Sequence, residues 1–157
     1  MTEGFDKFLE ASRNGNIVEI RRILGLDKSL VNMQDKYRLT TLIYASHYGH
    51  SEIVKTLLKN GALINIQDYN GLTALMHASY HGYTKTVKIL LKNGALVNMQ
   101  DNVGLTALMY ASSHGYFKIV KILVENGAQK EPIDIDGYSA LTYAVEQQNI
   151  KMIRLLT

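Results

Sequence analysis

A five-residue segment returns along this chain at a fixed interval. VNMQD occupies residues 31–35 and again 97–101, and the near copy INIQD lies between them at 64–68, so the spacing is 33 residues twice. Self-similarity at a period of 20 to 50 residues is typical of proteins built from stacked copies of one supersecondary unit. The period therefore constrains the fold more than any single residue does.

Glycines with the same spacing set the register of the units. Gly71, Gly104 and Gly137 are each 33 residues apart, and one further step back falls on Arg38. The segments 71–103 and 104–136 are identical at 20 of 33 aligned positions without a gap. The predicted units are 38–70, 71–103, 104–136 and a partial C-terminal unit 137–157, preceded by a divergent first unit at 4–37 that begins at Gly4.

The residue pattern within each unit predicts two short helices. In the third unit Thr73 can cap a first helix, Leu75 and Ala78 can face inward, and Gly82 can end it. A second helix is expected from about Thr84, with apolar residues on one side and lysines on the other. Residue types that cap helix N-termini occupy the capping position of all five units: Asp6, Thr40, Thr73, Thr106 and Ser139.

So short a helix pair cannot bury its apolar face alone, and neighbouring units must stack to form a continuous core. The pattern resembles the ankyrin repeat, a β-turn followed by two antiparallel helices. TALMHA at 73–78 and TALMYA at 106–111, followed by HGY, NGA and the VN..D segment, carry the resemblance in order. It covers essentially the whole chain and implies one all-α ankyrin-repeat solenoid over residues 1–157, with β-turn or hairpin-like connecting loops.

Two positions depart from the family pattern. The usual proline of the first helix is replaced by Thr41, Ala74, Ala107 and Ala140, and the usual histidine by Ile43, Met76, Met109 and Thr142. The resemblance implies that this histidine joins neighbouring units by a hydrogen bond. We expect apolar packing between repeats to replace it here.

The repeated VN..D segment is expected to shape the loops that link the units. Asparagine and aspartate side chains hydrogen-bond nearby backbone in turns, and we expect this of Asn32, Asn65 and Asn98 and of Asp35, Asp68 and Asp101, while Asp134 keeps the acid. A row of aspartates could also suggest a metal or acid site. Because each falls once per unit, we interpret the row as framework.

The same reasoning argues against a catalytic or metal-binding site. No nucleophile-elbow or phosphate-loop motif occurs, and the chain has no cysteine. His77 and His81 are four residues apart on a predicted helix, but HASYH lacks the catalytic glutamate of a zinc-protease motif and no third ligand is evident in the sequence. We expect no enzyme activity, no cofactor, no metal site and no small-molecule substrate.

Composition is ordinary for one soluble domain of 157 residues, with 46% hydrophobic and 20% charged residues. No signal-peptide pattern opens the chain, and no apolar run approaches the length of a membrane span. A formal charge of +3 is too mild to indicate nucleic acid by itself. We expect a monomer in the cytoplasm, or in a host cell if the source is a pathogen that exports effectors.

The resemblance implies a concave protein-binding surface made by loop tips and the inner face of the first helices. Tyrosine is enriched in binding hot spots because it supplies a large contact area at low entropic cost. Tyr44, His77, Tyr110 and Tyr143 share one register position and have a second interpretation, packing between helices. The predicted partner-binding residues are Tyr37, Tyr44, His47, Tyr48, Tyr69, His77, Tyr80, His81, Asn102, Tyr110 and His114.

The convex face, opposite the loop tips and first helices, carries an alternative candidate for the binding surface. One register position of the second helix is basic in every unit, and stacking turns it into a stripe of Arg21, Lys55, Lys88, Lys121 and Arg154. The stripe is either a solvated outer face or a docking surface for an acidic partner, nucleic acid or an anionic membrane.

Two local expectations complete the sequence-based predictions. The last unit stops before the NGA segment of its siblings, so Ile150 and Ile153 are expected to be partly exposed, or covered by another chain, or followed by further sequence. Arg38 stands at a glycine position, where we expect a positive φ.

Overall fold

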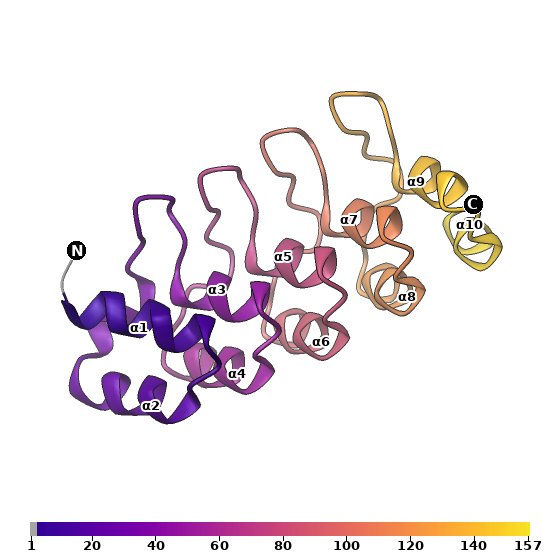
Figure 1. The fold of residues 1–157 in the computed structure, drawn as a ribbon. Coiled ribbons are helices and arrows are strands. Elements are labelled where there is room, and N and C mark those ends of the chain that lie inside the picture. The colour runs from indigo at the N-terminus through magenta and orange to yellow at the C-terminus, as the bar shows by residue number, and fades with distance from the viewer. Residues whose placement is uncertain (1–2) are drawn as a thin grey trace.

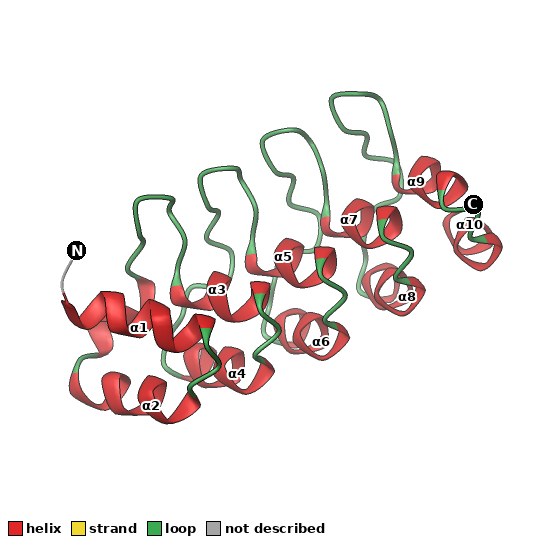
Figure 2. Cartoon of the chain, viewed as in Figure 1, coloured by secondary structure: helices red, strands yellow, loops and turns green. Residues whose placement is uncertain are grey.

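The computed structural model describes residues 3–157 as a single row of helix pairs, with the loops projecting from one side of the row (Figures 1 and 2). Within this range no β-strand forms, and Ile133 and Ser139 make one isolated bridge. A short 3-10 helix, Lys28–Asn32, follows the first pair. The pairs are α1 Glu3–Arg13 with α2 Ile17–Leu26, α3 Thr41–His47 with α4 Ser51–Lys59, α5 Ala74–Tyr80 with α6 Thr84–Lys92, α7 Ala107–Ser113 with α8 Phe117–Glu125, and α9 Ala140–Glu146 with α10 Ile150–Leu156.

Threonine or serine begins the first helix of units two to five, as predicted. The hydroxyls of Thr40, Thr73, Thr106 and Ser139 each accept a hydrogen bond from the backbone N–H three residues on. The prediction for Asp6 was wrong, because α1 begins at Glu3 and Asp6 lies in its first turn. Gly4 is likewise helical rather than a turn glycine, and it is not among the glycines with positive φ.

The core runs along the row between first and second helices. In α6, Val87 and Leu90 are fully buried while Lys85 and Lys88 are exposed, the division that the apolar spacing predicts. Ile53 and Leu57 repeat the arrangement in α4. Because each pair packs on the next, the buried residues form one continuous cluster from α1 to α10.

Three of the four glycines between the two helices of a pair, Gly15, Gly49 and Gly82, meet an aromatic ring of the following unit, and Gly115 meets nothing within 4 Å. A Cβ at Gly49 would lie 2.7 Å from the ring of Tyr83, and one at Gly82 would lie 2.8 Å from Tyr116. Both glycines also have positive φ, of 74° and 78°. In the fifth unit the equivalent position is Gln148, which also has a positive φ, of 51°.

The loops are held by their aspartates, as predicted. One oxygen of Asp68 accepts hydrogen bonds from the N–H groups of Asn70 and Leu72, both at 2.9 Å, and Asp35, Asp101 and Asp134 do the same in their own loops. Neighbouring loops are also joined through their backbones. The N–H groups of Tyr69, Asn102 and Ile135 donate to the carbonyls of Tyr37, Asn70 and Val103, each at 3.0 Å.

The prediction that the repeated asparagines bond local backbone was wrong. Asn98 donates to the carbonyl of Gly127 at 3.1 Å and accepts from the N–H of Gln129 at 2.8 Å, which ties its unit to the next one. Asn32 makes the same pair of bonds to Gly61 and Leu63, and Asn65 accepts from Leu96. Each side chain lies beside the end of the following helix pair, whose backbone groups there lack partners of their own.

Three of the four positions that replace the family's usual histidine pack as expected, whereas the fourth, Thr142, is only partly buried and bonds the N-cap residue Ser139. Ile43, Met76 and Met109 are each only 1% exposed. The two methionines have a further contact: their sulfurs accept from the N–H groups of Thr73 and Thr106, at 3.3 and 3.4 Å, and so complete weak capping boxes.

The two remaining local predictions are confirmed. Arg38 has a φ of 61°, close to the 84° of Gly71 at the next unit's equivalent position. Ile150 is 65% exposed and Ile153 is partly buried, so apolar side chains of the last helix pair do face solvent.

Candidate partner-binding groove

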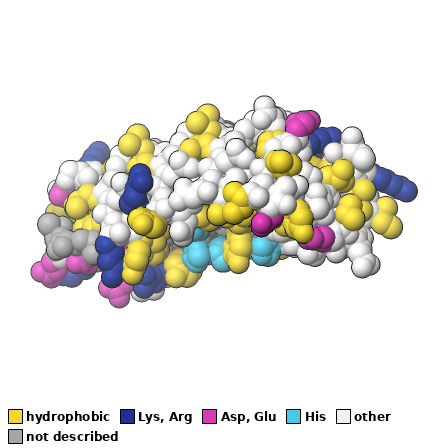
Figure 3. Space-filling view, turned by 90° about the horizontal axis from the view of Figure 1, so that it is seen from above, with side chains coloured by type: hydrophobic (Ala, Val, Ile, Leu, Met, Phe, Trp, Pro, Cys, Tyr) yellow, Lys and Arg dark blue, Asp and Glu magenta, His cyan; other side chains and the backbone are white. Residues whose placement is uncertain are grey.

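Aromatic and imidazole rings gather on the loop side of the first helices. Seen from above, the histidine side chains lie together near the middle of the molecule, with hydrophobic side chains, which include tyrosines, beside them (Figure 3). Tyr48, at 39% exposed, and Tyr80, at 40%, keep large areas in solvent. We call the surface formed by the loop tips and the exposed sides of α3, α5 and α7 the groove.

In units two to five, one ring position of the first helix is tied to the aspartate of the loop that leads into that helix. The hydroxyl of Tyr44 donates to Asp35 at 3.0 Å, and those of Tyr110 and Tyr143 donate to Asp101 and Asp134. In the third unit His77 Nε2 takes the same place, 2.9 Å from Asp68 Oδ2. These half-buried side chains fix the loop on the first helix, so this position serves the framework as well as the groove.

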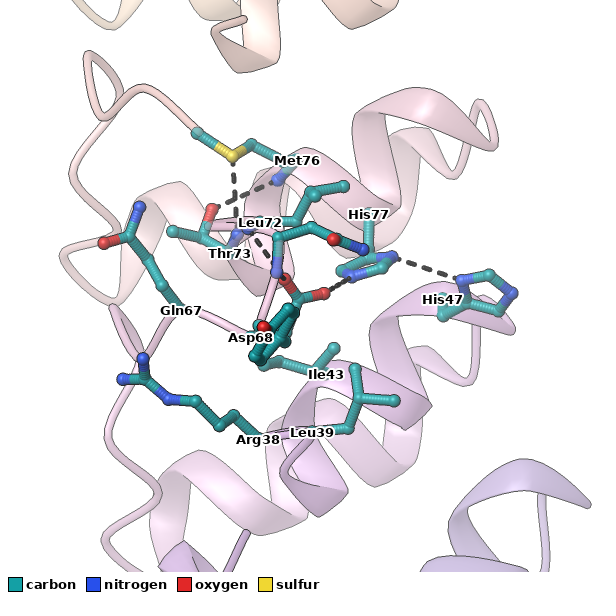
Figure 4. Close-up of polar contacts among 12 residues, drawn as sticks. Arg38, Leu39, Ile43, His47, Gln67, Asp68, Leu72, Thr73, Met76 and His77 are labelled. Carbon is teal, nitrogen blue, oxygen red and sulfur yellow. Dashed lines mark hydrogen bonds and ion pairs between the residues drawn. The ribbon is translucent and has the colours of Figure 1, made fainter. Parts of the chain in front are cut away.

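His77 also belongs to a cluster with His47 and His81, which we call the histidine cluster. His47 Nδ1 lies 3.2 Å from His77 Nδ1 and 3.2 Å from His81 Nε2 (Figure 4 draws the first contact). His47 comes from α3 and the other two from α5 and its C-terminus. The cluster therefore bridges two units.

The carboxylate of Asp68 determines where the protons of neutral rings lie. A carboxylate only accepts, so His77 must carry its hydrogen on Nε2 and present a lone pair at Nδ1. His47 must then donate from its own Nδ1, because two facing lone pairs would repel. The hydrogen on His47 Nδ1 in turn requires a lone pair at His81 Nε2. With neutral rings, the hydrogen on His47 Nδ1 is therefore shared with the lone pairs of His77 Nδ1 and His81 Nε2, and His47 Nε2 carries a lone pair.

The surroundings favour the neutral forms of His47 and His81. Burial and the positive charge that His81 or His77 would carry lower the pKa of His47 to about 4. Burial, with His77 and His114, also lowers the pKa of His81. Burial by itself would raise the pKa of Asp68, but hydrogen bonds from His77 and from the Leu72 and Asn70 N–H groups outweigh it, and the pKa is lowered. Asp68 is therefore an anion with its bonds already satisfied.

Ring contacts continue into the fourth unit. The ring centroids of Tyr80 and Tyr110 are 5.7 Å apart in an edge arrangement, and those of Tyr80 and His114 are 4.5 Å apart. On the other side His81 packs edge-on against His47 at 4.3 Å. Such contacts fix the ring orientations and present a continuous aromatic surface across three units.

A pocket of about 400 Å³ opens beside the histidine cluster. Its apolar lining includes Leu39 and the fully buried Ile43, and His47 contributes a polar group. We call this the aromatic pocket, because tyrosines of the loop tips and of α3 form most of its remaining wall: Tyr37, Tyr44, Tyr48 and Tyr69. The volume lies in the lower range of ligand pockets.

Every residue that the sequence predicted for partner binding lies on or beside this surface. Tyr37, at 55% exposed, and Tyr69, at 72%, form loop tips, and Asn102 and His114 are also exposed. Asn102 uses its amide to donate to the carbonyl of Tyr69 at 2.9 Å, so part of its bonding capacity serves the loop. Tyr44, His47, His77, His81 and Tyr110 are half-buried, and their role in binding stays a prediction.

Sequence reasoning missed the pocket floor and the link between His47 and the other two histidines. Leu39 and Ile43 look like ordinary core residues. The 33-residue register was a usable signal for the cluster, since His47 and His81 occupy neighbouring inner positions of successive first helices.

The convex face carries the predicted basic side chains, all of them exposed. Some are paired: Glu52 lies 3.0 Å from Lys55 and 3.3 Å from Lys85 of the next unit, and Lys121 lies 3.8 Å from Glu125. Exposed pairs of this kind contribute little to stability.

Residues 3–157 contain neither a group of side chains that could hold a metal ion nor a helix that could cross a membrane. In that range no three or more His, Asp or Glu side chains are grouped so that they could hold a metal ion. The helices of the same range are too short or too polar to cross a membrane.

Stacked helix pairs with projecting loops define a helical repeat protein. The family model for ankyrin repeats matches residues 8–101 and 93–157. The chain therefore belongs to the ankyrin-repeat family, whose repeats are general protein–protein interaction modules and are typically non-enzymatic. A comparison with curated proteins gives no match.

Proposed function

We propose that the chain is a non-enzymatic adaptor that binds a partner protein across the groove of units two to four. The observation that carries the proposal is the row of contacting rings, His47, His81, Tyr80 and His114, with Tyr48 beside it. Tyrosines held in place by neighbours lose little entropy on binding and are frequent hot-spot residues.

Charge distribution supports the groove over the convex face. Asp35, Asp68 and Asp101 already accept hydrogen bonds from tyrosine, histidine and backbone groups. The groups that the centre of the groove leaves open to a partner are therefore aromatic and hydrogen-bonding rather than charged. Depletion of charge at the centre with enrichment of tyrosine is the composition that distinguishes interface cores. Three stacked units are long enough for a standard interface of about 800 Å² on each partner.

The test is an affinity pull-down from the source cell followed by titration of the captured partner. Tyr48→Ala or Tyr80→Ala should weaken binding by about 2 kcal/mol if the residue is a hot spot. Both side chains are exposed to about two fifths, so the melting temperature should change little. The matched controls, Lys88→Ala and Lys121→Ala on the convex face, should leave the affinity intact.

The competing function is docking through the basic stripe. It would be favoured if the lysine variants abolished binding while both tyrosine variants bound normally. Binding through the stripe would also weaken steeply with salt, because each neutralised anionic group releases counterions.

A further inference from the structure

The charges of the chain are divided unequally between its two sides. The second helix of every pair, α2, α4, α6, α8 and α10, lies on the side of the row away from the loops (Figure 1). These five helices carry 11 of the 17 lysines and arginines but only three of the 14 acidic residues, which gives them a formal charge of +8 against +3 for the whole chain. The segments outside the second helices are therefore net acidic, and the basic charge lies on one side.

The basic side chains are densest on the three middle units. We call the exposed lysines of α4, α6 and α8 the basic face: Lys55, Lys59, Lys85, Lys88, Lys92, Lys118 and Lys121. The same helices carry two acidic residues, Glu52 and Glu125, which lie within 4 Å of Lys55, Lys85 and Lys121. The other four lysines of the face have no ion pair within residues 3–157.

The lysines form a two-dimensional array rather than a line. Lys85, Lys88 and Lys92 are three and four residues apart, so they share one side of α6. Lys55 occupies the register of Lys88 on the neighbouring helix, and packed helices lie roughly 8–10 Å apart. Glu52 lies 3.0 Å from Lys55 on its own helix and 3.3 Å from Lys85 on the next, so side chains of adjacent rows reach one another.

The residue types restrict what the face can recognise. A lysine ammonium is a point charge and lacks the planar fork with which arginine binds a single phosphate or carboxylate. The arginines of the second helices lie in the two end units. Phe117, the one aromatic residue of the five second helices, is partly buried and offers no open ring for a base to stack on. The face therefore suits a ligand recognised by its density of negative charge.

A fluid sheet of anions fits such an array. An acidic peptide, or one phosphate backbone of a duplex, presents its charges along a line, so it neutralises one row of lysines at a time. Anionic lipids present their charges in two dimensions and diffuse within the bilayer, so headgroups gather beneath every lysine without matching a fixed spacing. Each lysine near such a surface adds about fivefold to the affinity.

We propose that the basic face holds the molecule on a membrane surface rich in anionic lipids. The contact is electrostatic and peripheral, and the groove on the opposite side stays turned toward solvent. The proposal goes beyond the groove function, because it adds a second ligand on a side of the molecule that the protein partner does not use. Both ligands can then be bound at once.

Co-sedimentation of the full chain with vesicles tests the proposal, at an ionic strength of about 0.1 M. The two probes are vesicles of phosphatidylcholine with phosphatidylserine and vesicles of phosphatidylcholine alone. The chain should bind the first and not the second, and binding should weaken as salt is added, because salt screens the lysines from the headgroups. Equal binding to both kinds of vesicle would overturn the proposal.

Paired variants locate the contact. Lys88→Gln with Lys92→Gln removes two charges from the centre of the face and should lower the affinity for the anionic vesicles about 25-fold. Lys36→Gln with Arg38→Gln makes the same change in net charge on the loop side and should alter that affinity by less than about twofold. All four side chains are exposed, so both proteins should keep the fold, which circular dichroism checks. Equal losses in the two variants would mean that net charge alone attracts the chain, and would overturn the proposal.

Other polyanions are the remaining alternative. Duplex DNA and poly-glutamate are titrated at the same salt and at matched concentrations of negative charge, and tighter binding to either than to the anionic vesicles would overturn membrane docking. Lys88→Gln with Lys92→Gln should still capture the protein partner, because these residues lie outside the groove. If the vesicles do not bind while Tyr48→Ala still weakens partner capture, the groove function stands and membrane docking does not.

Discussion

At the scale of single residues, Arg38 and Gln148 are the non-glycine residues of the described chain with positive φ. Both stand at positions that the sibling units fill with glycine. Arg38 keeps the backbone bonds of its turn, donating its N–H to Asp35 and accepting from Gln34. Glycine could make the same bonds without the cost of a side chain in the left-handed region.

Arg38→Gly should therefore stabilise the protein by about 1 kcal/mol, measured by urea unfolding. The reciprocal change Gly71→Ala should destabilise it by more, because φ is 84° and a Cβ would lie 2.7 Å from the backbone nitrogen of Asn102. Loss of stability in Arg38→Gly would mean that the guanidinium makes a contact worth more than the backbone strain.

The histidine cluster predicts how stability depends on pH. The folded pKa of His47 is about 4, whereas an unfolded histidine titrates near ~6.5, so the unfolded chain takes up the proton first. The stability contributed by neutral His47 is thus complete above pH ~6.5 and is lost as the pH falls toward about 4. The lowered pKa of His81 acts in the same direction.

His47→Gln should reduce the fall in melting temperature between pH 7 and pH 4.5, recorded by circular dichroism. Tyr80→Phe, at the same repeat position, should leave that fall unchanged. An identical pH profile in His47→Gln and the unmodified protein would show that His47 protonates freely in the folded state. Asp68 acts in a lower window, because its own lowered pKa contributes stability that is lost only at more acidic pH.

At the scale of elements, most of each helix pair could be predicted from residue patterns. Local residue patterns that recur in every unit predicted the helix caps at Thr73 and Thr106, the buried side of α6 and the role of the loop aspartates. The contacts of Asn98 could not be predicted, because its partners lie 29 and 31 residues further along the chain. For the same reason the His47 contacts and the pocket appear only when neighbouring units are stacked.

Asn98→Ala tests the link between units. Two neutral hydrogen bonds to the following pair are lost, and Gly127 and Gln129 keep unpaired groups, so the free energy of unfolding should fall by about 1–2 kcal/mol. Lys88→Ala, on an exposed helix face, should change it by less than about 0.5 kcal/mol. Equal effects of the two variants would show that water replaces the asparagine without cost.

At the scale of the whole molecule, stability should decline toward the C-terminus of the row. Unit three has neighbours on both sides, whereas α9 and α10 pack on one neighbour only and expose Val145 and Ile150. In a stack, each unit is held largely by its interfaces, so a terminal unit opens more easily than an inner one.

Hydrogen exchange of the dilute protein should therefore show amides of 140–156 exchanging faster than those of 74–92. The slow-exchanging amides of α5 and α6 serve as the internal reference. Equal protection in both segments would contradict the expectation and would indicate that the exposed apolar side chains of the last pair are covered in solution.

The backbone bonds between loops have a consequence for how such a surface can change. The links from Tyr69 to Tyr37, from Asn102 to Asn70 and from Ile135 to Val103 use only N–H and carbonyl groups, so they do not depend on which side chains stand at the tips. Each loop is held by its aspartate and by a residue with positive φ three positions later, which is glycine except at Arg38, and among the tip side chains Asn102 adds one hydrogen bond to the carbonyl of Tyr69. If the loop tips bind the partner as proposed, changing the two residues between the aspartate and the positive-φ residue, by natural mutation or in the laboratory, alters specificity while these backbone links are kept.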